Sequence, residues 1–116
     1  MRTEASVREM VRAIQTEVRT DDLAPSRAAH LLLELTALLG NCSEEIRICD
    51  AAYAEVLLEC LNGSEAASRA KIRAETTSQF RRRQEARDTR ELVIELCRSL
   101  KYWLRSAEEE MRLTRG

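Results

Sequence analysis

Residues 79–113, QFRRRQEARDTRELVIELCRSLKYWLRSAEEEMRL, decide the fold class of this chain. In their second half, apolar side chains recur at intervals of three and four residues, which is the spacing of one face of an α-helix. These side chains are Val93, Leu96, Leu100, Trp103, Ala107 and Met111. A helix over the whole stretch is about 50 Å long. The sequence therefore predicts a long C-terminal helix whose second half supplies the core.

The first half of this predicted helix lacks the apolar stripe. Between Thr76 and Arg90 the only apolar candidates for burial are Phe80 and Ala86. We therefore expect this half to project from the other helices or to pack on a partner.

Upstream, apolar periodicity predicts a first helix from about Glu4 to Arg19, with Thr3 as its N-cap. Pro25 suits the first turn of the next helical stretch, which extends to Leu61. Gly40 and Asn41 resemble a helix end within it. An internal glycine costs only about 1 kcal/mol, so residues 25–61 form either one helix or two.

Polar residues at 62–64, Asn-Gly-Ser, break this pattern and are the expected main hinge. A short alanine-rich helix follows over residues 65–75. The run Thr76-Thr77-Ser78 then interrupts it and is placed to cap the long last helix.

Composition agrees with these local patterns. The chain has 116 residues, only three glycines and one proline, and 44% hydrophobic residues. An all-β fold needs more turn residues, and a disordered chain has fewer apolar ones. We expect an all-α fold, a bundle of four to five helices, as a single domain over 1–116 with an acidic half (1–61) and a basic half (64–115). The core of so small a domain is thin, which favours a homodimer or another stable partner.

Neither a membrane span nor a secretion signal is expected, because no run of 18 apolar residues occurs and Met1-Arg2-Thr3-Glu4 lacks an apolar region. The four cysteines, at positions 42, 49, 60 and 97, are spaced too widely for a zinc motif. We interpret them as buried thiols in a reducing compartment. The expected location is therefore the cytoplasm, and no cofactor or metal is expected.

The net charge of −1 conceals two opposite segments. Residues 1–68 hold six arginines against twelve acidic residues, whereas residues 69–90 hold eight cationic residues against three acidic ones. The eight cationic residues form the candidate binding site, and they are Arg69, Lys71, Arg73, Arg81, Arg82, Arg83, Arg87 and Arg90. We call residues 69–90 the basic segment.

Three interpretations of the basic segment stay open. It is a solvated helix face, or it pairs with the acidic N-terminal half within or between chains, or it contacts nucleic acid or an acidic protein surface. Arginine suits phosphate and carboxylate recognition. Phe80 is the only aromatic residue in the segment, which disfavours single-strand stacking but not contact with a phosphate backbone.

Enzymatic chemistry is not expected. One histidine, His30, offers no nucleophile–base pair, and no phosphate-loop, metalloprotease or serine-hydrolase motif occurs. A metal-dependent nucleotide hydrolase remains as an alternative, with its candidate carboxylates being Glu44, Glu45, Asp50, Glu55 and Glu59. A helix-turn-helix around Gly40 is disfavoured, because its recognition helix would present acidic residues to DNA.

Residues 69–115 support one resemblance, carried by Arg69-Ala70-Lys71-Ile72 and Ser99-Leu100-Lys101-Tyr102-Trp103-Leu104. The stretch resembles the C-terminal half of small, uncharacterised helical proteins of bacteriophages and prophages. The resemblance implies a phage origin and a host cytoplasmic location, and it brings no active site.

The expected function is that of a non-enzymatic phage-type binding protein. Its basic segment would contact nucleic acid, or a protein of nucleic-acid handling or host defence. The alternative is a homo-oligomeric assembly protein in which the basic segment pairs with the acidic half of a neighbouring chain.

Overall fold

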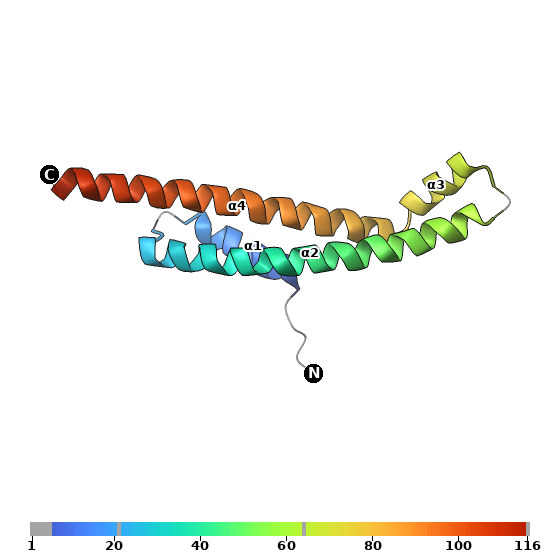
Figure 1. Ribbon diagram of the computed structural model, residues 1–116, viewed down its shortest axis with the longest axis horizontal. Helices are drawn as coiled ribbons and strands as arrows, with labels where there is room; N and C mark the ends of the chain where they lie inside the picture. The colour runs from blue at the N-terminus through green and yellow to red at the C-terminus, as the bar shows by residue number, and fades with distance from the viewer. Residues whose placement is uncertain (1–5, 21, 64, 116) are drawn as a thin grey trace, which may run out of the picture.

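Figure 1 shows the computed structural model, which describes residues 6–20, 22–63 and 65–115. Four α-helices and no strand occur in these ranges: α1 (Val7–Val18), α2 (Pro25–Leu61), α3 (Ala67–Glu75) and α4 (Ser78–Arg115). The predicted all-α class and the long C-terminal helix are confirmed.

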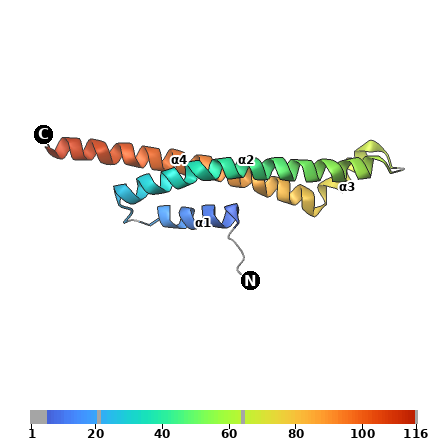
Figure 2. The same cartoon turned by 60° about the horizontal axis from the view of Figure 1, so that its bottom comes forward.

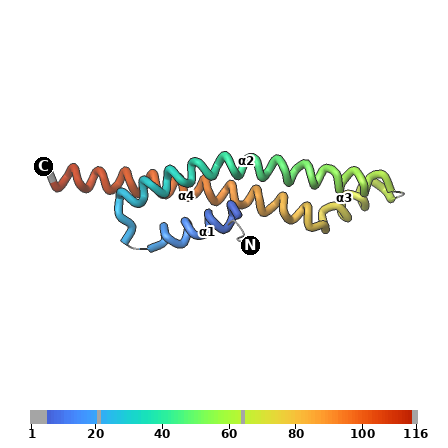
Figure 3. Tube along the Cα trace, turned by 90° about the horizontal axis from the view of Figure 1, so that it is seen from below, coloured from blue at the N-terminus to red at the C-terminus, as the bar shows by residue number. Residues whose placement is uncertain are grey.

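Helices α2 and α4 form an antiparallel pair that runs along the whole molecule (Figures 1 and 3). With 37 and 38 residues, each is about 55 Å long. The molecule measures 74 × 37 × 21 Å and has a radius of gyration of 20.0 Å, whereas a compact domain of this length has about 13 Å. The predicted compact bundle is therefore not confirmed, because the single chain is elongated.

The short helices flank this pair at different places. Helix α1 lies beside the first half of α2 and the middle of α4, and α3 lies at the far end of α2 (Figures 1 and 2). The core lies where α1, α2 and α4 meet. Its buried members are Val11, Ile14, Ala28, Leu31, Leu35, Leu38, Cys42, Val93, Leu96, Cys97 and Leu100.

Residues 25–61 form one helix, which settles the alternative between one helix and two. Gly40 lies inside α2, and a Cβ at this position would have no other atom within 4 Å. Leu38 and Cys42 on either side are buried in the core. Their burial outweighs the weak helix propensity of one exposed glycine. A helix-turn-helix centred on Gly40 is thereby wrong.

Helix α1 is shorter than predicted. Its N-cap is Ser6, whose Oγ accepts a hydrogen bond from the backbone N–H of Glu9 at 3.2 Å. The predicted N-cap, Thr3, lies outside the described residues. The helix ends at Val18, with Arg19 as its C-cap.

The break between α3 and α4 lies where the threonine run predicts it. The Oγ of Thr77 accepts from the backbone N–H of Phe80 at 3.3 Å and donates to the carbonyl of Ala74 at 2.6 Å. Thr77 thus satisfies one backbone group on each side of the junction. The break after α2 is also confirmed at Asn62 and Gly63, while Ser64 lies outside the described residues.

The two halves of α4 are arranged opposite to expectation. The basic first half does not project, because Ala86 and Thr89 are buried against the neighbouring helices. The opposite end projects instead: α4 continues past the start of α2, and Met111 is 53% exposed (Figure 1). Trp103, predicted in the core, is 37% exposed. Counting large apolar residues misled the prediction, since small side chains also close a helix–helix contact.

No helix in the described part of the chain is long and apolar enough to span a membrane. The cysteines are unpaired thiols. Cys42 and Cys97 are buried, as expected, whereas Cys49 and Cys60 are only half-buried.

Candidate binding surface of the basic segment

Two arginines of the basic segment hold α4 against α2. The Arg83 Nε donates to Asp50 Oδ1 at 3.0 Å, and a terminal nitrogen of Arg87 donates to the same oxygen at 3.3 Å. Arg83 also lies over the Tyr53 ring, with its guanidinium carbon 4.8 Å from the ring centroid. Tyr53 in turn packs on Phe80 at a centroid distance of 5.4 Å. We call these five residues the Asp50 clasp.

The clasp gives part of the basic segment a structural role. Asp50 belongs to the acidic half, so this pairing of basic and acidic residues occurs inside one chain. Their sequence separations of 33 and 37 residues hide the contact from any local pattern.

Two further cations of the segment have acidic neighbours. Arg73 forms an ion pair with Glu65, which precedes α3. Arg90 lies 3.9 Å from a carboxylate oxygen of Glu91, at the outer limit of an ion pair.

The remaining four predicted site residues make no ion pair with any described residue. Arg69 and Lys71 lie on α3, and Arg81 lies in the first turn of α4, all of them exposed. We call these three residues the basic corner, since only Thr76 and Thr77 separate the two helices. Arg82 is separate from them because it lines a cavity beside α1.

The carboxylates considered for a metal site do not converge. Asp50 is held in the clasp, and Glu44 accepts hydrogen bonds from Arg47 on its own helix, which lowers the pKa of Glu44. Across the described ranges, no group of three or more His, Cys, Asp or Glu residues has metal-binding geometry.

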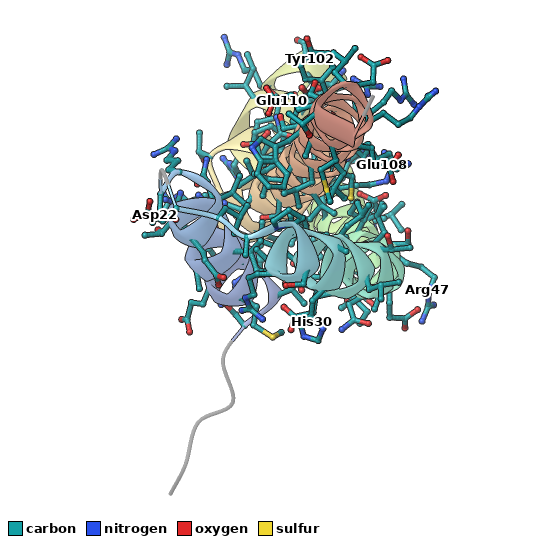
Figure 4. The ribbon with its side chains drawn as sticks, turned by 90° about the vertical axis from the view of Figure 1, so that its left-hand side faces the viewer. Asp22, His30, Arg47, Tyr102, Glu108 and Glu110 are labelled. Atoms are coloured by element: carbon teal, nitrogen blue, oxygen red, sulfur yellow. The ribbon has the colours of Figure 1, made fainter. Side chains whose placement is uncertain are left out.

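The lone histidine is an exposed residue of α2. His30 Nε2 lies 3.0 Å from Glu34 Oε1, one helical turn away. His30 and Arg47 both point outward from α2, away from α1 and α4 (Figure 4).

The sequence patterns did not predict one ion pair that connects two helices. The Nε and one terminal nitrogen of Arg27 donate to the two Glu17 carboxylate oxygens, at 2.5 and 2.8 Å, and connect the end of α1 to the start of α2. This hydrogen bonding lowers the pKa of Glu17 and raises the pKa of Arg27. An acid and an arginine ten residues apart across a predicted turn were the available signal.

Three of the four thiols have a raised pKa. Burial is the main cause that raises the pKa of Cys42, Cys49 and Cys97. A reactive cysteine needs the opposite shift, towards the thiolate.

Comparison with known proteins finds no matching family model, no matching curated protein and no matching solved structure. The resemblance to phage proteins is therefore neither supported nor contradicted by a relative.

Proposed function

We propose that this chain is a non-enzymatic, phage-type binding protein whose basic corner contacts the phosphate backbone of nucleic acid. The observation that carries the proposal is that Arg69, Lys71 and Arg81 are exposed and form no ion pair within the described residues. Their charge is available to a partner, unlike the charge of Arg83 and Arg87.

Phosphate contact fits this arrangement better than base recognition. Exposed cations on helix surfaces bind a nucleic-acid backbone without sequence preference, typically with dissociation constants of about 10⁻⁴ to 10⁻⁶ M. Stacking of single-stranded bases requires exposed aromatic rings, and Phe80, the aromatic residue of the segment, is engaged with Tyr53. We therefore expect weak binding that depends strongly on salt.

The test is a binding titration at several salt concentrations with short duplex DNA and duplex RNA. The wild-type chain is compared with a triple variant, Arg69→Glu, Lys71→Glu and Arg81→Glu. Each lost phosphate contact lowers the slope of log affinity against log salt by about 0.9, so the variant should lose up to about 3 units.

A matched control changes three exposed cations on the second half of α4, in the variant Lys101→Glu, Arg105→Glu and Arg112→Glu. The control has the same net charge as the first variant. Equal losses in both variants would show that only net charge matters. No binding by the wild-type chain at low salt would refute the nucleic-acid proposal.

A second candidate function, homo-oligomeric assembly, is favoured by a separate observation. Tyr102, Met111 and Leu113 are 73%, 53% and 82% exposed on the projecting half of α4. Large apolar residues on a thin, elongated chain favour association, which here would complete a helical bundle from two chains. Light scattering between low and high micromolar concentrations tests this: a concentration-independent monomer would contradict it.

A further inference from the structure

The buried side chains between α2 and α4 become smaller beside the start of α1. Towards the C-terminus from Val93, large apolar side chains fill it. Before Val93, the buried positions of α4 are Thr89 and Ala86, and α2 contributes Cys42 and Cys49. These small side chains leave a cavity of about 180 Å³ between the three helices.

Small, buried side chains form the floor of this cavity. Cys42, Ala86 and Thr89 are 1%, 7% and 6% exposed. The Thr89 hydroxyl donates to the carbonyl of Glu85 at 2.8 Å, so its proton is already used.

The rim of the cavity carries two positive and two negative side chains. Arg8 comes from α1, Glu45 from α2, and Arg82 and Glu85 from α4. None of the four forms an ion pair with a described residue, in contrast to the clasp nearby. The rim thus carries two cations and two anions that form no ion pair within the described residues.

Both signs of charge reach the cavity wall. Burial is the main cause that raises the pKa of Cys49, Glu45 raises it further, and Arg82 opposes both. A carboxylate and a guanidinium thus act on the same thiol from different helices.

The N-terminal end of helix α1 also contributes to the electrostatics of the cavity. Ser6 and Val7 line the cavity, so the N-terminal end of α1 lies at its edge. A helix N-terminus carries unsatisfied N–H groups and about half a positive charge. The guanidinium groups of Arg8 and Arg82 favour a carboxylate, whereas the carboxylates of Glu45 and Glu85 favour an ammonium group.

We propose that this cavity binds a small zwitterion of the free α-amino acid class, with its carboxylate towards Arg8 and Arg82 and its ammonium group towards Glu45 and Glu85. The volume equals about six water molecules at about 30 Å³ each, which suits an amino acid. Pockets for drug-sized ligands measure about 300–1,000 Å³, so this cavity is too small for such ligands. A lone anion or cation would leave two like charges of the rim unsatisfied.

Thiol labelling of the full-length protein provides the readout. Cys49 lines the cavity and is half-buried, whereas Cys60 is half-buried further along α2 and outside it. Labelling of each thiol is followed by mass spectrometry with free alanine, aspartate, glutamate, arginine or methionine at about 10 mM, since so small a ligand binds weakly. At least one amino acid should slow labelling of Cys49 several-fold and leave Cys60 unchanged.

Two variants test the cavity volume and the charges of the rim separately. Ala86→Leu fills the floor and should abolish protection of Cys49 without unfolding the chain. The double variant Arg82→Gln and Glu85→Gln keeps the cavity but should weaken protection at least tenfold. Arg98→Gln, on an exposed face of α4 away from the cavity, is the matched control and should behave as the wild-type chain.

Acetate and methylamine test the ligand class, because each carries only one of the two charges. Protection by either one as strong as by an amino acid would overturn the zwitterion assignment. The proposal also fails if no amino acid protects Cys49, or if protection survives in the double variant. Neither result depends on nucleic-acid binding, since Arg69, Lys71 and Arg81 are not changed.

Discussion

At the scale of single residues, Asp50 joins α2 to α4 through ion pairs. It accepts from both Arg83 and Arg87, and Arg83 also stacks on Tyr53. We expect Asp50→Ala to lower the free energy of unfolding by about 1 kcal/mol, because the pairs are partly exposed and screened by solvent. Urea unfolding followed by circular dichroism measures this change.

The matched comparison is Glu44→Ala on the same helix. Its partner Arg47 is one turn away on the same helix and both side chains are exposed, so the loss should be smaller than that caused by Asp50→Ala. Equal losses in the two variants would contradict a role of the clasp in joining the helices.

The buried thiol of Cys42 should make the folded chain less stable at alkaline pH. Burial raises its pKa in the folded chain, whereas the thiol of the unfolded chain ionises near its ordinary value of about 8.5. Above this pH the unfolded state releases a proton that the folded state retains, so stability falls as pH rises. Below it both states are protonated, and this thiol adds no pH dependence.

Urea midpoints between pH 7 and pH 10, measured under reducing conditions, test this linkage. Cys42→Ala should flatten the alkaline decline. Cys60→Ala, which removes a half-buried thiol outside the core, should leave the slope as in the wild-type chain. An identical slope in Cys42→Ala would show that other groups cause the decline.

The candidate residues were predictable in kind but not in role. Clustering in the sequence identified Arg83 and Arg87, and it also identified Arg69 and Arg81. Whether an arginine meets a carboxylate depends on the register between α2 and α4, which no local periodicity contains. The cavity residues Cys42 and Ala86 carried no signal, since a small side chain on an apolar face is usually closely packed.

At the scale of elements, the continuity of α2 through Gly40 allows a sharp test. A Cβ at this position meets no other atom within 4 Å. Gly40→Ala should therefore raise the free energy of unfolding by about 0.5–1 kcal/mol, through the lower backbone entropy of the unfolded chain. Thermal and urea unfolding both measure it.

Gly63, after the end of α2, is the matched control. A Cβ there would lie 3.4 Å from the carbonyl oxygen of Cys60, an ordinary contact outside the helix. Gly63→Ala should therefore bring no comparable gain. Destabilisation by Gly40→Ala would mean that the exposed face around Gly40 is covered by another molecule in solution.

Helix positions were largely predictable, because apolar spacing, Pro25 and the threonine run at 76–77 act locally. The projection of the C-terminal end of α4 was not predictable. Periodicity in α4 continues to Met111, but whether a stripe is covered depends on where its partner ends. Because α2 begins at Pro25, it does not reach far enough to cover the last turns of α4 (Figure 1).

At the scale of the whole molecule, slenderness limits what the chain can bury by itself. A radius of gyration of 20.0 Å leaves a single seam between α2 and α4 as the main contact, closed on one side by α1. The acidic half and the basic segment meet at this contact, where Asp50 pairs with Arg83 and Arg87.

Truncation of the projecting end of α4 tests whether this end is exposed in solution or covered by a second chain. The side chains of residues 108–114 are all exposed. A chain that stops after Ala107 should lose less than about 1 kcal/mol of unfolding free energy, because these residues bury almost no apolar surface. Stopping after Leu100 also removes Leu104, which packs on the core, and should cost about 2–5 kcal/mol. If both truncations destabilise equally, and light scattering shows that the full chain is an oligomer, then residues 108–114 are buried between chains, and the assembly function gains over the nucleic-acid one.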